Sequence, residues 1–414
     1  MAKIIFMNIP AHGHVNPTLP AAQELIRRGH QVIYYNTPDF GDKIAHTGAD
    51  FRPYPEPNPT AAQISAKAAN IVNFSLLMLA ETQRLLPFVL AEVERERPHL
   101  IVFDSLCLWG QHAANRLDIA TVASISHLIL EDVAGFTWRD RLHVVRHALP
   151  HVPRLLKLRR QLVRDHGPAI FPAGDIFPAL GERNLLFTSR HFQPETPFID
   201  ESFRFVGPAL DHDSRPALDF PFDLLGNRPL VYVSLGTIHQ GWDDFYRGAM
   251  ATLAGFPAQF VLSVGKQTDP ADLAPIPDNF IVRPEVPQLA LLPRVNLFVT
   301  HGGINSVHEG LYFGVPLVVA PQQFEQMFNG RQVVAHGAGI MVNERPPYGR
   351  LNGDELRTAV QTVLADEGYR AAARRIGDTL QQAGGYRRAA AEIEQAVQQA
   401  GSQQRLRLPS QRPG

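Results

Sequence analysis

The chain has 414 residues, of which 45% are hydrophobic and 19% charged, and its formal net charge at pH 7 is −1. A chain of this length is too long for one compact core, so we expect two domains of ordinary globular composition. The charge balance gives no general attraction to nucleic acid, and we expect no nucleic-acid partner. The only cysteine, Cys107, excludes an intramolecular disulfide and fits a reducing compartment, so we expect a cytoplasmic protein.

The N-terminal residues begin an α/β pattern. Residues 4–9 predict a buried strand, residues 17–28 a helix and residues 31–35 a second strand. This order is typical of a doubly wound parallel sheet, but the Gly-x-Gly-x-x-Gly of dinucleotide-binding folds is missing, which argues against NAD or FAD. Asn8 and Pro10 interrupt the first apolar run, so we expect neither a signal peptide nor a membrane-spanning helix there.

Two histidines and an aspartate follow predicted strands of this first half. His12 and His14 lie in the turn AHGHVNP after the first strand. Residues 61–97 carry apolar residues at helical spacing, and the strand at 100–103 then ends in Asp104. Open α/β sheets bind ligands at the carboxyl ends of their strands, so these three are candidate site residues. A neutral imidazole, with an ordinary pKa of about 6.5, can accept a proton at pH 7.

A basic stretch and a linker follow. Residues 139–166 carry eight Arg or Lys residues and two Asp residues, a local net charge of +6. One interpretation is a weak contact with a membrane surface or an anionic acceptor, and the other, which we favour, is a solvated helical face. Residues 207–229 are rich in Pro, Gly and Asp, which predicts an interdomain linker. Asp211 and Asp213 there resemble an Asp-x-Asp metal motif, but two carboxylates alone are a poor magnesium site, so we interpret them as solvated loop.

A second αβ half begins at Leu230. Apolar segments predict its strands at 230–234, 260–265, 279–284, 296–300 and 316–320, and residues 354–398 are predicted to be helical. We therefore predict an N-terminal domain at 1–206, a C-terminal domain at 230–399 and a disordered tail at 400–414.

The most informative segment is 296–329, NLFVTHGGINSVHEGLYFGVPLVVAPQQFEQMFN. A strand, a glycine turn, a helix and a second strand form a βαβ unit whose turn opens at the carboxyl end of the strand. Backbone N–H groups at a helix N-terminus suit a phosphate, and a nearby carboxylate can accept from a ribose hydroxyl. We therefore predict a nucleotide-diphosphate site formed by His301, Gly302, Gly303, Asn305, Ser306 and Glu309.

The run HGGxNSxxE resembles the donor-binding motif of the family 1 glycosyltransferases, close to the bacterial macrolide glycosyltransferases. The resemblance covers nearly the whole chain, because the Gly-His-x-x-Pro element of the family maps onto residues 13–17. It implies the GT-B fold, an α/β fold with two facing Rossmann-like domains, parallel sheets and an interdomain cleft. In this family the N-terminal domain binds the acceptor and the C-terminal domain binds the nucleotide sugar.

The resemblance also implies roles for single residues. The family's base maps onto His14, and the Asp that hydrogen-bonds this base maps onto Asp104, whereas His12 is placed beside the pocket. Further matches are Glu325 and Gln326 to the acid–amide pair that binds sugar hydroxyls, Ser234 and Thr237 to a phosphate-contacting turn, and Val286 and Gln288 to the nucleobase site.

One departure concerns the nucleobase. Many relatives place an aromatic residue before Val-Pro-Gln to stack on the base, and this chain has Glu285 there. The family also usually has Asp where this chain has Glu325. These differences leave the choice between uracil and thymine, and the hydroxyl preference for the sugar, open.

The expected function is inverting, metal-independent transfer of a hexose, glucose before others, from a UDP-sugar to a hydroxyl group of an apolar small molecule. The acceptor would be a natural product, flavonoid, macrolide, sterol or carotenoid, and no prosthetic group is expected. The alternatives are transfer from a TDP-deoxysugar, a UDP-sugar epimerase of the same fold, and a non-enzymatic protein that binds a nucleotide sugar or a lipid.

Overall fold

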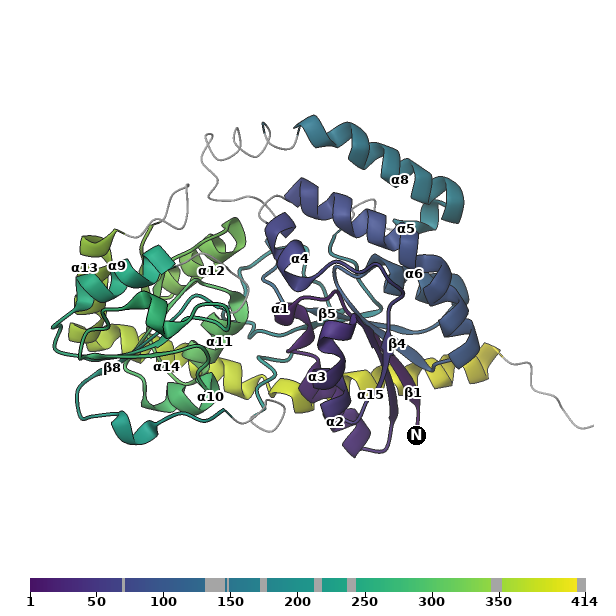
Figure 1. The fold of residues 1–414 in the computed structure, drawn as a ribbon. Helices are drawn as coiled ribbons and strands as arrows, with labels where there is room; N and C mark the ends of the chain where they lie inside the picture. Colours follow the sequence, from purple (N-terminus) through teal and green to yellow (C-terminus); the bar gives the residue numbers. More distant parts are fainter. Residues whose placement is uncertain are drawn as a thin grey trace, which may run out of the picture. The chain divides into compact units, whose positions relative to one another are not determined.

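A computed structural model describes residues 1–68, 71–130, 146, 149–171, 177–211, 218–236, 243–343 and 352–407. The chain forms two compact units (Figure 1). Unit 1 comprises Met1–Phe187, Glu195–Ala209 and Gly384–Gly414, and unit 2 comprises Thr188–Pro194 and Leu210–Ala383.

Unit 1 is built on a seven-stranded sheet with the order β3-β2-β1-β4-β5-β6-β7, in which all neighbouring strands are parallel. The strands are β1 (Lys3–Met7), β2 (Gln31–Asn36), β3 (Asp50–Pro53), β4 (Leu100–Asp104), β5 (Thr121–Ile125), β6 (Arg183–Leu186) and β7 (Phe203–Phe205). β4 and β5 are buried along their whole length, as expected for parallel strands covered on both faces.

The helices of unit 1 cover both faces of this sheet. They are α1 (His12–Val15), α2 (Leu19–Arg27), α3 (Gly41–His46), α4 (Ala61–Ala68), α5 (Ile71–Glu96), α6 (Leu108–Leu117), α8 (Val152–His166) and α15 (Gly385–Arg407). Alternate residues of β1 serve the two faces: Ile5 and Met7 pack in the core formed with α5 and α6, whereas Ile4 and Phe6 pack in the core formed with α2 and α15. The apolar run predicted as a buried strand therefore fills two cores at once.

Helix α5 lies in the core of unit 1. Its residues Val72–Glu96 are long and apolar enough to cross a membrane by composition alone, with a mean hydropathy of 1.3. Met78, Leu86 and Val89 on this helix are fully buried or nearly so, and the helix packs against α6 and α8. These contacts are those of a core helix, and burial in the core explains its apolar composition.

Unit 2 is built on a six-stranded parallel sheet with the order β10-β9-β8-β11-β12-β13. Its strands are β8 (Leu230–Ser234), β9 (Gln259–Ser263), β10 (Phe280–Arg283), β11 (Leu297–Thr300), β12 (Leu317–Val319) and β13 (Gly339–Met341). Its helices are α9 (Asp243–Leu253), α10 (Gln288–Leu291), α11 (Ile304–Tyr312), α12 (Phe324–Ala335), α13 (Gly353–Ala365) and α14 (Glu367–Gln382). Each strand predicted for the second half is found. From the neighbouring central strands β8 and β11, the later strands are added toward opposite edges of the sheet.

The C-terminal helix differs from the sequence prediction. Residues 384–399 were assigned to the C-terminal domain, but α15 packs on α2, β4 and β5 of unit 1. Its Ala389, Ala390 and Ile393 are buried in the unit 1 core, which explains why this segment leaves the unit that precedes it. Residues 400–407 of the predicted tail are helical, because α15 continues to Arg407; residues 408–414 lie outside the described part of the chain.

The segment that connects the units was predicted at 207–229. The first long segment of unit 2 begins at Leu210, within that range, and the short segment Thr188–Pro194 also belongs to unit 2 although it was assigned to the N-terminal domain. Phe192 explains this second difference, because its buried ring packs against His308 and His336. Of the predicted Asp-x-Asp pair, Asp213 lies outside the described residues.

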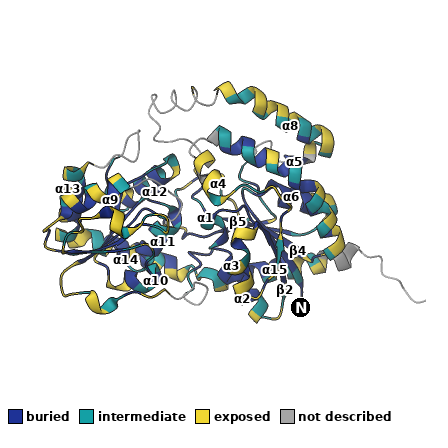
Figure 2. Cartoon of the chain, in the orientation of Figure 1, coloured by how far each residue is buried: buried dark blue, intermediate teal, exposed yellow. Residues whose placement is uncertain are grey.

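The described part of the basic stretch is mainly helix α8. Arg154, Lys157, Arg160 and Arg164 are exposed along one side, while Leu162 on the other side is buried in the unit 1 core (Figure 2). Arg139 and Arg141 lie outside the described residues. The arrangement is that of an amphipathic surface helix. A contact with a membrane surface stays a prediction.

Candidate active site

The carboxyl edge of the unit 1 sheet brings His14 and Asp104 together. β1 ends at Met7, and the loop after it leads into the short helix α1, which carries His14. Asp104 is the last residue of the neighbouring strand β4. The distance from His14 Nδ1 to Asp104 Oδ2 is 2.7 Å, and the side chains are 19% and 0% exposed. A buried carboxylate thus holds one nitrogen of a ring that is partly open to solvent.

Two further contacts fix this pair. The second carboxylate oxygen of Asp104 accepts a hydrogen bond of 2.9 Å from the backbone N–H of Leu106. The side-chain amide of Asn8 donates to the backbone carbonyl of His14 at 2.8 Å. With Nδ1–H directed at the carboxylate, Nε2 is the nitrogen that can accept a proton, and the carboxylate stabilises the imidazolium that results. This arrangement can act as a general base.

The sequence analysis missed Ser126, which lies in the loop after β5. Its Oγ is 3.1 Å from His14 Nδ1, next to the carboxylate contact. His127 follows it, and burial, together with the charge of His14, lowers the pKa of His127 to about 4, so His127 is neutral at pH 7. The available signal was position: both residues follow the strand beside the one that ends in Asp104.

His12 contacts a different set of residues, Phe40 and Lys43. Its ring lies 4.9 Å from the ring of Phe40, and its Nδ1 is 3.4 Å from Lys43 Nζ. The predicted place of His12 beside a pocket, away from the proton transfer, stays a prediction.

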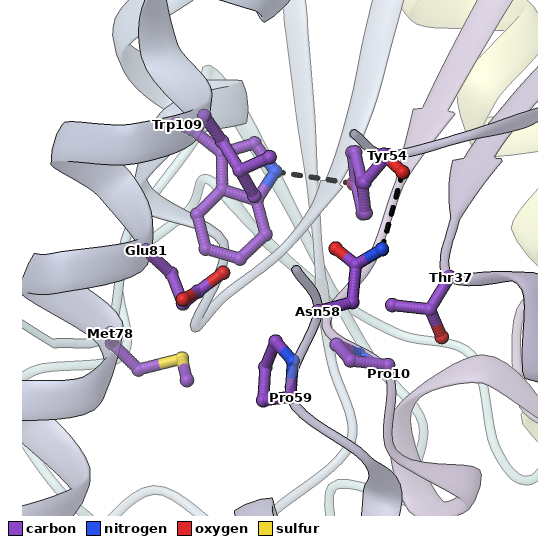
Figure 3. Close-up of a pocket in the computed structure, with 9 residues that line it drawn as sticks. Pro10, Thr37, Tyr54, Asn58, Pro59, Met78, Glu81 and Trp109 are labelled. Carbon is purple, nitrogen blue, oxygen red and sulfur yellow. Dashed lines mark hydrogen bonds between the residues drawn. The ribbon is translucent and has the colours of Figure 1, made fainter. Parts of the chain in front are cut away.

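A pocket of unit 1 lies next to the loop that carries the histidine. Its walls come from Pro10, Thr37, Tyr54, Asn58, Pro59, Met78, Glu81, Leu85 and Trp109, and its cavity volume is only about 10 Å³, apart from space open to solvent (Figure 3). The indole N–H of Trp109 donates to the hydroxyl of Tyr54 at 3.1 Å, and this hydroxyl donates to the carbonyl of Asn8 at 3.3 Å. The side-chain amide of Asn8 also donates to the carbonyl of His14, so Asn8 connects the pocket wall to the segment that carries His14.

In unit 2 the glycine turn lies between β11 and α11. Gly302 has a φ of +89°, and a Cβ there would approach Gln326 O to 2.8 Å and Val319 Cγ1 to 2.7 Å. A Cβ on Gly303 would approach His301 Nε2 to 2.5 Å, and one on Gly236 would approach His301 Cε1 to 2.8 Å. The imidazole therefore lies against two glycines, and a Cβ at either position would require the ring to move.

The turn leads into an open helix N-terminus. α11 begins at Ile304, after Gly303 as the N-cap, and no side chain caps it. Asn305 and Ser306 lie half-buried in the first turn, as predicted for residues near the helix start. The first backbone N–H groups of a helix have no partner within the helix, so this terminus suits an anion such as a diphosphate.

Glu309 and Gln288, predicted separately for the nucleotide, contact each other. Gln288 Nε2 donates to Glu309 Oε2 at 2.6 Å, and Gln288 Oε1 accepts from the hydroxyl of Tyr232 at 3.0 Å. Val286 is buried just before α10. Glu285, which stands where many relatives have an aromatic residue, forms an ion pair with Lys266, whose Nζ lies 3.1 Å from the carboxylate.

The acid–amide pair lies at the start of α12. Glu325 Oε1 accepts from Asn329 Nδ2 at 3.3 Å, and the same amide donates to the carbonyl of Gly302 at 2.9 Å. Gln326 Oε1 accepts from the backbone N–H of Gln322 at 2.8 Å. Asn329, which the sequence analysis did not single out, thus links the acid to the glycine turn.

Ser234 and Thr237 were predicted to contact phosphate. Ser234 ends β8 beside β11, and its Oγ accepts from the N–H of Gly236 at 3.4 Å. Thr237 lies outside the described residues. The structure therefore places Ser234 at the same sheet edge as the glycine turn.

The chain is similar to known transferases. A model of the UDP-glucoronosyl and UDP-glucosyl transferase family matches residues 219–381. The chain is 32% identical to YojK, an uncharacterized UDP-glucosyltransferase of Bacillus subtilis, over 392 residues that cover 93% of this chain and 95% of that protein. It is 34% identical to the NDP-glycosyltransferase YjiC of Bacillus licheniformis over 341 residues, which cover 81% and 84% of the two chains.

Solved structures show the same fold. The glycotransferase of kitacinnamycin superposes with a TM-score of 0.80 at 30% identity, covering 96% of this chain and 99% of that one. A calicheamicin glycosyltransferase has a TM-score of 0.78 at 26% identity, covering 96% and 98%. The fold and these relatives therefore define a glycosyltransferase of the GT-B type. Within that class, the chain belongs to the UDP-glucoronosyl and UDP-glucosyl transferase family, as the sequence motif predicted.

Proposed function

We propose that this glycosyltransferase moves a hexose, glucose before others, from a UDP-sugar to a hydroxyl group of an apolar small molecule, with inversion at the anomeric carbon. The observation that carries the proposal is the 2.7 Å contact between His14 Nδ1 and Asp104 Oδ2. A binding protein has no need of a base that is oriented in this way, whereas transfer to a hydroxyl does.

The proposed step is a single displacement. His14 Nε2 removes the hydroxyl proton while the acceptor oxygen forms a bond to the anomeric carbon and the bond from that carbon to the diphosphate oxygen breaks. The imidazolium is stabilised by Asp104, and UDP leaves with the bonding electrons. One displacement at one carbon inverts its configuration.

The leaving diphosphate is proposed to lie at the N-terminus of α11. Backbone N–H groups there, with donors from His301 and Ser306, stabilise the charge that develops on the leaving oxygen. We therefore propose activity without a divalent ion. Turnover that is unchanged in EDTA would support this, and turnover lost in EDTA and restored only by Mg²⁺ would contradict it.

The remaining donor contacts follow the same logic. We propose that the Glu309 carboxylate accepts from the ribose hydroxyls, that Glu325 and Gln326 bind sugar hydroxyls, and that backbone groups at Val286 meet the pyrimidine edge. The name of the relative YojK, a UDP-glucosyltransferase, favours UDP and glucose. The acceptor is proposed to lie on the unit 1 side, where the pocket beside Trp109 offers mainly apolar walls.

A TDP-deoxysugar donor is the second candidate. One relative, 29% identical over 401 residues, is named demethyllactenocin mycarosyltransferase of Streptomyces fradiae. Glu285 replaces the ring that many relatives stack on the nucleobase, so the nucleobase would make fewer contacts here. A thymine methyl group would not lie against such a ring. The relatives reported above are named transferases, which favours transfer over epimerisation and over simple binding.

The test uses purified full-length protein in EDTA. Calorimetric titrations with UDP and TDP identify the nucleotide, and incubation of UDP-glucose with a panel of hydroxylated apolar acceptors, followed by mass and NMR analysis, identifies the product and its anomeric configuration. A β-glucoside from α-linked UDP-glucose would support the proposal. Tighter binding of TDP would select the second candidate, and binding of neither nucleotide would contradict both.

A further inference from the structure

Tyr232 lies behind the nucleotide-binding residues rather than among them. It is the third residue of β8, is 1% exposed, and stacks on Phe298 of the neighbouring strand β11 with ring centroids 4.8 Å apart and planes 20° apart. The two rings are directly opposite each other in the register of the strands. This stack fixes the ring, and the hydroxyl contacts Gln288 at the start of α10.

The hydrogen bonds of Gln288 can run in only one direction. A carboxylate accepts hydrogen bonds and does not donate them, so the amide NH₂ of Gln288 must face Glu309, at 2.6 Å. The amide oxygen then faces Tyr232, which donates its hydroxyl proton at 3.0 Å. Reversing the amide would set its oxygen against the carboxylate, and the 2.6 Å contact would be lost. The chain of donors is therefore Tyr232 to Gln288 to Glu309.

The geometry of this chain depends on three separate elements. Tyr232 comes from the sheet, Gln288 from the start of α10 and Glu309, 4% exposed, from α11. A charged acceptor makes the amide-to-carboxylate bond the stronger of the two, and hydrogen bonds in series strengthen one another. Without the hydroxyl, the amide oxygen of Gln288 loses the partner that fixes its plane, and the carboxylate loses its fixed donor.

We propose that Tyr232 is a positioning residue for recognition of the donor's ribose. It holds the amide of Gln288, and this amide holds the Glu309 carboxylate in the orientation that accepts ribose hydroxyls. The inference rests on the proposed contact between Glu309 and the ribose. It concerns binding of the nucleotide and not the proton transfer at His14.

The test is Tyr232→Phe, which keeps the stacked ring and removes only the hydroxyl. The affinities for UDP and for 2′,3′-dideoxy-UDP are measured by calorimetry, and KM and kcat are measured with UDP-glucose. We expect UDP affinity to fall ~3- to 10-fold, as for loss of one hydrogen bond, with KM rising by a similar factor and kcat nearly unchanged. The affinity for the dideoxy nucleotide should not change, because it lacks the hydroxyls that Glu309 would bind.

The matched control is Tyr246→Phe. Tyr246 is also 1% exposed in unit 2, and its hydroxyl donates to the Ser263 carbonyl at 3.4 Å, away from Gln288. This variant should bind UDP like the wild type. In a Glu309→Gln background, Tyr232→Phe should add no further loss, because the acceptor that it positions is already changed.

The two proposals fail in different ways. If the wild type prefers UDP over dideoxy-UDP but Tyr232→Phe binds both as before, the role of Tyr232 is wrong and the ribose contact stands. If Tyr232→Phe weakens both nucleotides equally, the hydroxyl supports the fold and not ribose recognition, which overturns the inference. If the wild type binds both nucleotides equally, the ribose contact of Glu309 is itself wrong, and the role of Tyr232 is overturned with it.

Discussion

The carboxyl edges of the two sheets are built in different ways. In unit 1 the polar side chains at the edge come from distant segments, Asn8, His14, Asp104 and Ser126, and they converge on one ring nitrogen and one carbonyl. In unit 2 most of the predicted site comes from one continuous segment, in which glycines and a helix N-terminus replace side-chain pairs. In the proposed function, the first edge moves a proton and the second holds an anion.

This difference shows which interactions determine the geometry of each sheet edge. The unit 1 edge depends on side-chain hydrogen bonds, so changing one partner should alter chemistry and leave the fold intact. The unit 2 edge depends on backbone geometry, so adding a single carbon should alter binding. The predictions below test that contrast.

The largest effect on nucleotide binding is expected for Gly302→Ala. The residue has a φ of +89°, and its added Cβ would lie 2.8 Å from the Gln326 carbonyl oxygen, so the turn must shift. We expect UDP affinity to fall ~100-fold, since strain and backbone displacement together cost about 3 kcal/mol. Gly337→Ala is the control, because Gly337 has a similar φ of +68° with nothing within 4 Å of an added Cβ. Equal UDP affinity in both variants would show that the turn does not hold the nucleotide.

The next effect concerns the attachment of α15 to unit 1. Arg183, 8% exposed, pairs with Glu392, 1% exposed, and Arg388 donates to the same carboxylate at 2.6 Å. Arg183→Leu should destabilise unit 1 by about 3 kcal/mol, because a buried carboxylate loses a partner. Hydrogen exchange should rise in β6 and α15 and stay unchanged in the unit 2 sheet. The exposed pair of Arg164 and Asp165 supplies the control, for which Arg164→Leu should cause no measurable change.

Acid should destabilise unit 2 through His308. Burial lowers its pKa to about 3, and its Nε2 contacts Thr188 Oγ1 at 3.0 Å. The unfolded chain binds a proton below about pH 6.5 while the folded one does not, so the stability present above that pH is lost as the pH falls toward 3. Denaturant titrations at pH 7 and pH 5 should show a loss of about 2 kcal/mol from this group. In His308→Gln that part of the pH dependence should disappear, and an unchanged pH dependence would contradict the account.

The smallest effect is expected at Glu285. Glu285→Trp would place a ring where many relatives stack one on the nucleobase, and a stacked pair contributes about 1 kcal/mol. UDP should therefore bind ~5-fold more tightly. Glu285→Leu removes the ion pair with Lys266 without adding a stacking ring, and it should leave the affinity unchanged. If both variants bind UDP equally well, the base does not lie over this position.

The fold and the proposed unit 2 site were easier to predict from the sequence than the proposed unit 1 site. Both sheets follow from apolar runs such as those of β1 and β11, and the glycine turn with Glu309 is legible because its residues are contiguous. The pairing of His14 with Asp104 needed the family resemblance, because 90 residues separate them and no periodicity links them.

What could not be predicted depends on tertiary packing. The hydroxyls of Ser126 and Tyr232 become informative only when neighbouring strands place them beside a histidine and an amide. The assignment of α15 to unit 1 depends on the fit of Ala389, Ala390 and Ile393 into a core formed by residues far away in the sequence. Helical spacing predicted the helix but carried no information about which sheet it covers.

The measurement that tests the central claim most directly is a comparison of transfer and UDP binding in His14→Ala. The account predicts that transfer from UDP-glucose falls by ~10³-fold or more while UDP affinity stays within about twofold of the wild type, since the base lies in unit 1 and the proposed nucleotide contacts lie in unit 2. Transfer near the wild-type rate would show that His14 is not the base. A parallel loss of UDP affinity would contradict the division of labour between the two sheet edges.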